Sequence, residues 1–92
     1  KTYNTPEIRV DCPERYKFEV VKEVTQFFSQ QYSTVTVDGV RDLFEDGWGL
    51  VRASNTQPVL VLRFEALSQK RLEEIRELIE GKLEQVKSRL TT

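Results

Sequence analysis

Residues 47–65 read GWGLVRASNTQPVLVLRFE and contain the two strands that decide the fold. Residues 48–53 and 59–65 each predict a strand, and the polar segment Ser54-Asn55-Thr56-Gln57-Pro58 separates them. Residues 59–62 are apolar at four consecutive positions, which is typical of a strand buried on both faces. We therefore predict two strands, the second of which is the most buried strand of a sheet.

Two amphipathic helices flank this core. Pro13 suits the first turn of a helix, and a stripe with a 3.6-residue period follows it. The stripe consists of Tyr16, Val20, Val24 and Phe27, with Val21 and Phe28 beside them. After the strands, Leu67 and Ser68 stand where a hydrophobic staple and a helix N-cap are expected. The second stripe consists of Leu72, Ile75, Ile79, Leu83, Val86 and Leu90, with Gly81 as its one irregularity.

Shorter strands complete the pattern. Residues 7–10 and 34–37 alternate between polar and apolar side chains, and Asp38-Gly39 is a turn signal before residues 40–44. The order Asp42-Leu43 breaks the alternation in that last segment. The sequence therefore predicts an α+β fold, in which two helices cover one face of an antiparallel sheet of four to five strands.

Length and charge limit the functions that this chain can carry by itself. With 92 residues, we expect residues 1–92 to form a single domain, so an interdomain cleft would need other parts of a longer protein. The 14 Lys plus Arg nearly balance the 15 Asp plus Glu, which gives a net charge of −1. We therefore expect no general attraction to nucleic acid or to an anionic membrane, and any anion site should be local.

Missing and rare residue types add further limits. Cys12 is the only cysteine, which excludes an intrachain disulfide and favours a reducing, cytoplasmic location. Histidine, the commonest general base and metal ligand, is absent. No apolar run approaches the roughly 18 residues of a membrane-spanning helix, so we expect a soluble protein. The chain opens on Lys1 and lacks methionine, which suggests a domain excised from a longer protein.

The segment between the two central strands carries the chemistry. Arg52, Ser54, Asn55 and Thr56 offer a guanidinium fork, two hydroxyl groups and an amide within five residues. A phosphate dianion has several acceptor lone pairs, and the planar guanidinium can meet two of its oxygens at once. The same polar residues also satisfy the backbone of ordinary strand connections, so an ordinary polar turn is the alternative.

The sequence DGWGLVRASNTQPVLVLRFEA at residues 46–66 resembles the C-terminal domain of bacterial phosphomannomutase/phosphoglucomutase, of the α-D-phosphohexomutase superfamily. The resemblance covers nearly the whole chain. Residues 3–8, Tyr-Asn-Thr-Pro-Glu-Ile, resemble the lead-in from the preceding domain, so that residues 1–6 would be that lead-in. Residues 38–40, Asp-Gly-Val, resemble the turn before the Gly-Trp-Gly strand.

The resemblance implies a fold and a site. In that family the domain is similar to a TATA-box-binding-protein-like α+β sheet, and the loop holds the phosphate of the hexose phosphate. Carried over by position, Arg52, Ser54, Asn55 and Thr56 would be the phosphate ligands. Gln57 stands where relatives often have Glu, which could alter contacts of the loop or of the sugar.

The resemblance also implies a reaction. A phosphoryl group would move reversibly between the 1- and 6-positions of a hexose, through a phosphoserine and a hexose 1,6-bisphosphate. The preferred sugar, whether mannose, glucose or glucosamine, is left open. The serine and the loop that binds Mg²⁺ belong to other domains, so we expect no catalytic residue or metal ligand here. The isolated domain should be an inactive monomer whose partners are hexose phosphates and those other domains.

Other functions remain as alternatives. Residues 46–53 echo the glycine-aromatic strand of RNA-binding modules, but Asp46 replaces the cation, and Leu50 and Ala53 replace stacking aromatics. A protein-interaction module could use the stripe of the last helix, although such stripes usually pack on their own sheet. Trp48 could be a sugar platform or a buried anchor. The carboxylates Glu73, Glu74, Glu77, Glu80 and Glu84 favour a solvated helix face over a metal site.

Overall fold

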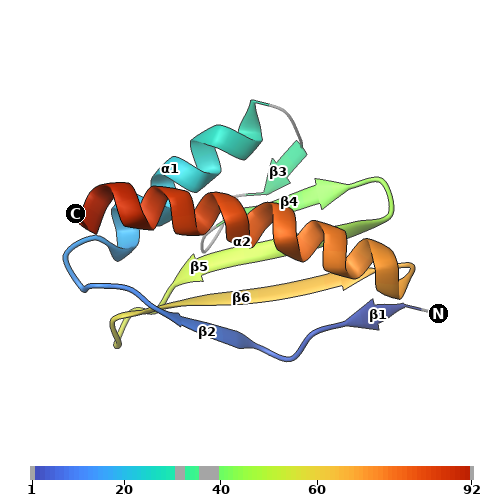
Figure 1. The fold of residues 1–92 in the computed structure, drawn as a ribbon, viewed down its shortest axis with the longest axis horizontal. Helices are drawn as coiled ribbons and strands as arrows, with labels where there is room; N and C mark the ends of the chain where they lie inside the picture. The colour runs from blue at the N-terminus through green and yellow to red at the C-terminus, as the bar shows by residue number, and fades with distance from the viewer. Residues whose placement is uncertain (1, 31–32, 36–39, 92) are drawn as a thin grey trace.

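The computed structural model describes residues 2–30, 33–35 and 40–91, with the backbone alone described for 33–35 and 40–44. Six strands and two helices lie within these ranges (Figure 1). They are β1 (Tyr3–Asn4), β2 (Ile8–Asp11), α1 (Lys17–Ser29), β3 (Ser33–Val35), β4 (Val40–Phe44), β5 (Gly47–Ala53), β6 (Val59–Ala66) and α2 (Gln69–Thr91). The predicted order of elements is confirmed, with β1 as an additional short strand.

All pairings in the sheet are antiparallel. The strands follow the order β3, β4, β5, β6, and both β1 and β2 pair with the remaining edge of β6. The six strands thus fill five positions across the sheet. Both helices pack into one hydrophobic core with the sheet, on the same side of it (Figure 1). The predicted fold class, an antiparallel sheet with two helices on one face, is confirmed.

β6 is buried on both faces at residues 60–62, as its apolar run predicts. Leu60, Leu62 and Phe64 are at most 1% exposed and belong to the core under the helices. Val61 points to the opposite, helix-free face of the sheet and is still only 3% exposed. The strand that follows the polar segment is therefore the centre of the molecule.

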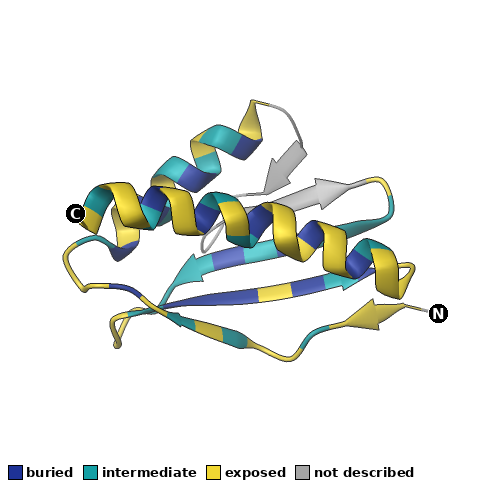
Figure 2. Cartoon of the chain, in the orientation of Figure 1, coloured by how far each residue is buried: buried dark blue, intermediate teal, exposed yellow. Residues whose placement is uncertain are grey.

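The buried side of α2 follows the predicted stripe (Figure 2). Its buried residues are Leu72, Ile75, Ile79, Leu83 and Val86. The N-cap prediction is also confirmed, because the Arg71 N–H donates to Ser68 Oγ at 3.1 Å. Leu67, the expected staple residue, remains 61% exposed, so a staple would bury little of its side chain.

α1 begins later than its leading proline suggests. The carbonyl of Pro13 accepts hydrogen bonds from the N–H groups of Tyr16 and Lys17, at 2.9 and 3.1 Å. Residues 14–16 therefore form a turn, and the helix starts at Lys17. The apolar stripe then lies as predicted, with Val20, Val24 and Phe28 fully buried.

The segment around the third and fourth strands differs slightly from the prediction. β3 is described over residues 33–35, and residues 36–37 of the predicted strand and the predicted turn at Asp38-Gly39 lie outside the described residues. β4 runs through residues 40–44 without interruption, so the order Asp42-Leu43 does not break the strand. Of the helices that the structure describes, neither is long and apolar enough to cross a membrane.

Candidate functional site

The candidate loop, residues 54–58, joins β5 to β6 at the end of the molecule where α1 begins and α2 ends (Figure 1). Arg52 lies one residue before the end of β5. Because Val51 is fully buried under the helices, the alternation along the strand directs Arg52 to the helix-free face. Within the described part of the chain, the half-buried Arg52 has no hydrogen-bond or ion-pair partner. Its guanidinium is therefore available to a ligand.

The loop owes its shape to a local turn at Ser54. Ser54 Oγ accepts hydrogen bonds from the N–H groups of Thr56 and Gln57, at 3.3 and 3.2 Å. The Ser54 N–H donates to the Val59 carbonyl at 3.0 Å. These bonds occupy three backbone N–H donors that could otherwise face an anion, but the hydroxyl hydrogen of Ser54 stays available. The turn is thus stable without a ligand, as expected for an ordinary polar turn.

The four predicted phosphate ligands are placed close together in the chain and differ in exposure. Arg52 lies in β5, and Ser54 directly follows the last residue of that strand. Asn55 and Thr56 follow at the exposed tip of the loop. The side-chain donors at this site are therefore one guanidinium, two hydroxyl groups and one amide, which suit a tetrahedral oxyanion.

Gln57 is held by contacts that the sequence did not reveal. Arg9 Nη1 donates to Gln57 Oε1 at 2.5 Å, and Lys17 Nζ donates to the Gln57 backbone oxygen at 3.0 Å. Lys17 Nζ also lies 3.0 Å from a carboxylate oxygen of Glu14. In the sequence, the only sign of these contacts is the position of Lys17, three residues before Val20 in the buried stripe of α1.

The local electrostatics favour an anion although the net charge of the chain is −1. Val61 pairs with Arg52 on one side and with Arg9 on the other, so the two arginines flank it on the helix-free face. Adjacent strands lie about 4.8 Å apart, which puts the two arginine Cα atoms on the order of 10 Å from each other. Two guanidinium groups therefore stand beside the loop.

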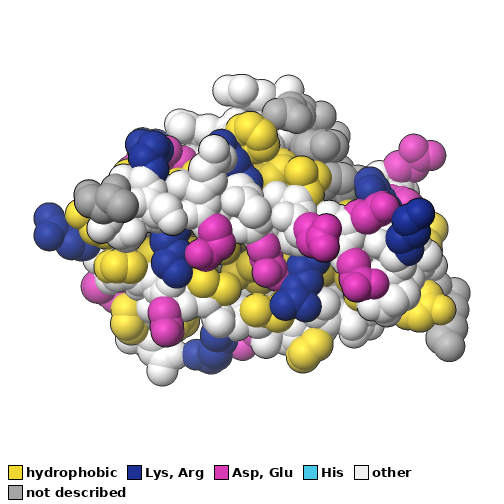
Figure 3. All heavy atoms as spheres, in the orientation of Figure 1, with side chains coloured by type: hydrophobic (Ala, Val, Ile, Leu, Met, Phe, Trp, Pro, Cys, Tyr) yellow, Lys and Arg dark blue, Asp and Glu magenta, His cyan; other side chains and the backbone are white. Residues whose placement is uncertain are grey.

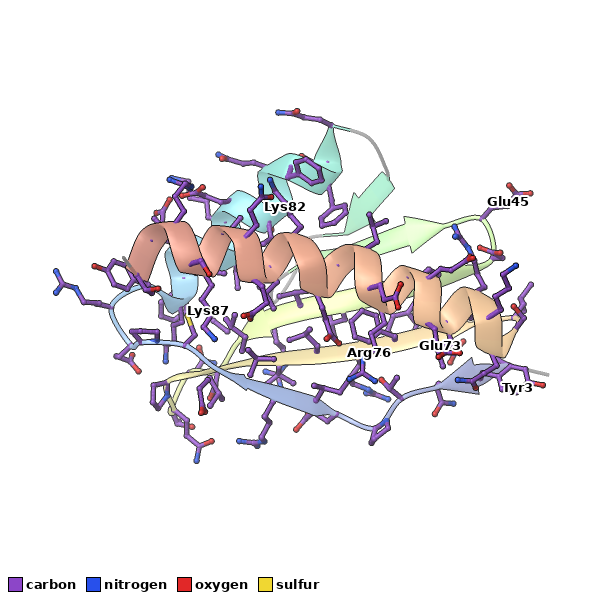
Figure 4. The ribbon with its side chains drawn as sticks, viewed as in Figure 1. Tyr3, Glu45, Glu73, Arg76, Lys82 and Lys87 are labelled. Carbon is purple, nitrogen blue, oxygen red and sulfur yellow. The ribbon has the colours of Figure 1, made fainter. Side chains whose placement is uncertain are left out.

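Cys12 lies behind the loop and is a structural thiol. It is 2% exposed, and its N–H donates to the Pro58 carbonyl at 2.9 Å. Burial raises the pKa of the Cys12 thiol; Lys87 opposes this shift and Glu84 adds to it. A raised pKa disfavours the reactive thiolate. Lys87, labelled in Figure 4, leaves α2 toward this region and lines a hollow together with Cys12 and Pro58.

The glutamates of α2 form a solvated surface. Acidic and basic side chains are interspersed over this helix (Figure 3). Arg76 pairs with Glu80 at 2.6 Å, and Arg71 pairs with Glu74 at 3.3 Å. Among the residues that the structure describes, no three His, Cys, Asp or Glu side chains are grouped so that they could hold a metal ion.

Trp48 lies at the other end of β5 from the loop. It is half-buried and lines a hollow of about 370 Å³ together with Glu45, Asp46 and Glu65. Trp48 and Arg52 are four residues apart, which corresponds to about 13 Å along a strand. The tryptophan therefore belongs to a region separate from the candidate loop.

The comparison with protein families decides the assignment. The family described as "Phosphoglucomutase/phosphomannomutase, C-terminal domain" matches residues 7–82. The chain belongs to this family. Its sequence is 46% identical over 89 residues to a phosphomannomutase/phosphoglucomutase from Pseudomonas aeruginosa, covering 95% of this chain and 19% of that protein. It is 39% identical over 87 residues to a phosphoglucomutase from Neisseria gonorrhoeae, covering 91% and 19%.

A solved structure supports the same family. The fold matches a phosphoglucomutase/phosphomannomutase family protein from Burkholderia thailandensis with a TM-score of 0.77 and 32% sequence identity. The match covers 95% of this chain and 18% of that one. This mutase C-terminal domain thus spans about a fifth of the length of the relatives it matches. The resemblance noted in the sequence is confirmed.

Proposed function

We propose that this domain anchors the phosphate of a hexose phosphate in a phosphomannomutase/phosphoglucomutase. The observation that carries the proposal is the uncommitted guanidinium of Arg52 beside a preformed turn with hydroxyl groups at Ser54 and Thr56. Membership of the mutase family makes a sugar phosphate the natural ligand for such a site. The substrates would be hexose phosphates and hexose 1,6-bisphosphates.

Each proposed ligand has a distinct role. The Arg52 fork would meet two phosphate oxygens, which gives both charge and orientation. The Ser54 and Thr56 hydroxyls and the Asn55 amide would donate to the remaining lone pairs. The anchored phosphate would be the one that does not react. Binding energy from this remote group would orient the sugar at the reacting centre and help close the active-site cleft.

The remaining parts of the reaction would lie in the rest of the enzyme. We propose that residues 1–92 are one C-terminal domain, with residues 1–6 leading in from the preceding domain. The phosphoserine and the Mg²⁺ site would belong to other domains of the enzyme. The enzyme would act in the cytoplasm, and this domain alone would be a monomer.

Binding can be tested by titrating the 92-residue chain with glucose 1-phosphate and following backbone amides by NMR. Shifts should concentrate on residues 52–56 and spare α2. We expect a dissociation constant near millimolar, about −4 kcal/mol, because the other walls of the cleft are missing and water competes for each donor. Glucose without phosphate is the control and should cause no shifts there. Shifts scattered over the surface would leave residues 52–56 as an ordinary polar turn.

Catalysis should be absent from this chain. The phosphoryl donor and the metal loop are proposed to lie elsewhere, so we expect no phosphoryl transfer by the domain alone. A coupled assay with glucose 1-phosphate, glucose 1,6-bisphosphate and Mg²⁺ should detect no glucose 6-phosphate above the level without protein. Turnover that co-purifies with the domain through several columns would contradict this division of roles.

A further inference from the structure

Lys17 is the one charged side chain that is buried among the described residues. It is 1% exposed, which is rare for lysine unless the ammonium is paired. Its Nζ lies 3.0 Å from a Glu14 carboxylate oxygen and donates to the Gln57 backbone oxygen at 3.0 Å. The Glu14 side chain is 66% exposed. The second partner of the ammonium is thus a backbone carbonyl of the candidate loop, in a partly buried hydrogen bond.

Gln57 is the residue at which the loop is fixed. Its N–H donates to Ser54 Oγ at 3.2 Å, and its carbonyl accepts from both Lys17 and the N–H of Val59. Its side-chain oxygen accepts from Arg9 at 2.5 Å. Three parts of one exposed residue are therefore held, although the phosphate-binding groups proposed above come before it in the chain.

We propose that Lys17 is a positioning residue for phosphate binding. By holding the Gln57 carbonyl, its ammonium keeps the turn at Ser54 closed, so that the Ser54 and Thr56 hydroxyls converge on one oxyanion. Lys17 itself does not touch the phosphate. This role rests on the proposed function of the loop, and it links the start of α1 to the geometry of the site.

A substitution at Lys17 also removes a positive charge and perturbs α1, and each of these effects needs a matched control. Loss of a positive charge near the loop is matched by Lys87→Met, because Lys87 lies in the same region, beside Pro58, and pairs with Glu84. Loss of stability in α1 is matched by Val24→Ala, which truncates a fully buried side chain of the same helix. Neither control removes a hydrogen bond to Gln57.

The test compares Lys17→Met with the two controls in titrations with inorganic phosphate, followed by amide NMR. We expect Lys17→Met to raise the dissociation constant about two- to tenfold, the range spanned by the net worth of one hydrogen bond. Amide hydrogen exchange at Thr56 and Gln57 should also become faster. The controls should change both quantities less than about twofold, and Lys17→Arg, which keeps a charged donor, should recover much of the affinity. Unchanged affinity and exchange in Lys17→Met overturns the role of Lys17.

The outcomes separate this role from the proposed function. Arg52-dependent phosphate binding that survives Lys17→Met refutes only the positioning role. Absence of phosphate shifts in the unmutated chain refutes the loop site and, with it, the role of Lys17. If Lys17→Met does not fold, Lys17→Gln takes its place in the same comparison, and unchanged affinity and exchange in that variant overturn the proposal.

Discussion

Gly47→Ala is expected to destabilise the domain by about 1–3 kcal/mol, the usual cost of overpacking a filled core. A Cβ at Gly47 would lie 2.5 Å from the backbone oxygen of Glu65, 2.8 Å from Ile75 Cδ1 and 3.0 Å from the Ala66 Cα. Two of these neighbours are backbone atoms of β6, so a side-chain rotation alone cannot relieve the clash. Either β5 or β6 must therefore shift, whereas Ile75 Cδ1 is the end of a flexible side chain of α2 and can rotate away.

The matched control is the same substitution in α2. A Cβ at Gly81 meets no atom within 4 Å, and the residue is exposed in the middle of the helix. Gly81→Ala should therefore stabilise the domain by about 0.5–1 kcal/mol, because alanine loses less backbone entropy in a helix. Urea unfolding of both variants measures the two changes in the free energy of unfolding. Equal stability of Gly47→Ala and the unmutated chain would mean that β5 and β6 do not approach each other at Gly47 as closely as described.

Arg52→Ala should have the largest effect on function. In the full-length mutase, we expect kcat/KM to fall by the worth of a charge-assisted contact, roughly 1.5 to 3 kcal/mol or about 10- to 150-fold. In the isolated domain, the same change should abolish the phosphate shifts at residues 52–56. Arg52→Lys should weaken binding without abolishing it, because an ammonium keeps the charge and loses the two-oxygen fork.

The control for this prediction is Arg63→Ala. Arg63 is exposed on β6 and projects to the same helix-free face as Arg52, because its neighbours Leu62 and Phe64 are buried under the helices. The substitution removes an equal charge from the same surface but leaves the loop intact. Activity in Arg63→Ala should stay within about threefold of the unmutated enzyme, as for surface changes generally. Equal losses of kcat/KM in the two variants would mean that the positive charge of this surface matters in general and that Arg52 has no specific contact with the phosphate.

The helices and the central strands could be predicted because their patterns are local. The stripe from Leu72 to Leu90 and the run at residues 59–62 describe which faces are buried without any knowledge of their partners. The start of α1 was misplaced, since Pro13 suits a helical first turn as well as the separate turn that it forms here. β1 was not predicted, because two residues carry no periodicity and their pairing with β6 is distant in sequence.

Only the local part of the candidate site could be predicted from the sequence, because contacts between distant residues leave no local pattern. Arg52, Ser54, Asn55 and Thr56 stand within one short segment, so their donors could be recognised together. The hydrogen bond from Lys17 to Gln57 joins residues 40 positions apart, and that from Arg9 joins residues 48 apart. Such contacts depend on how α1 and β2 dock beside the loop, which no local pattern encodes.

The most direct test of the central claim is a structure of this domain, or of the full-length enzyme, with a hexose phosphate bound. We expect the phosphate within hydrogen-bond distance of the Arg52 guanidinium and of at least two groups from Ser54, Asn55 and Thr56. Gln57 should keep its bonds to Lys17 and Arg9. A phosphate held elsewhere, for example at Arg63 or in the hollow beside Trp48, with the loop empty, would contradict the proposed phosphate site.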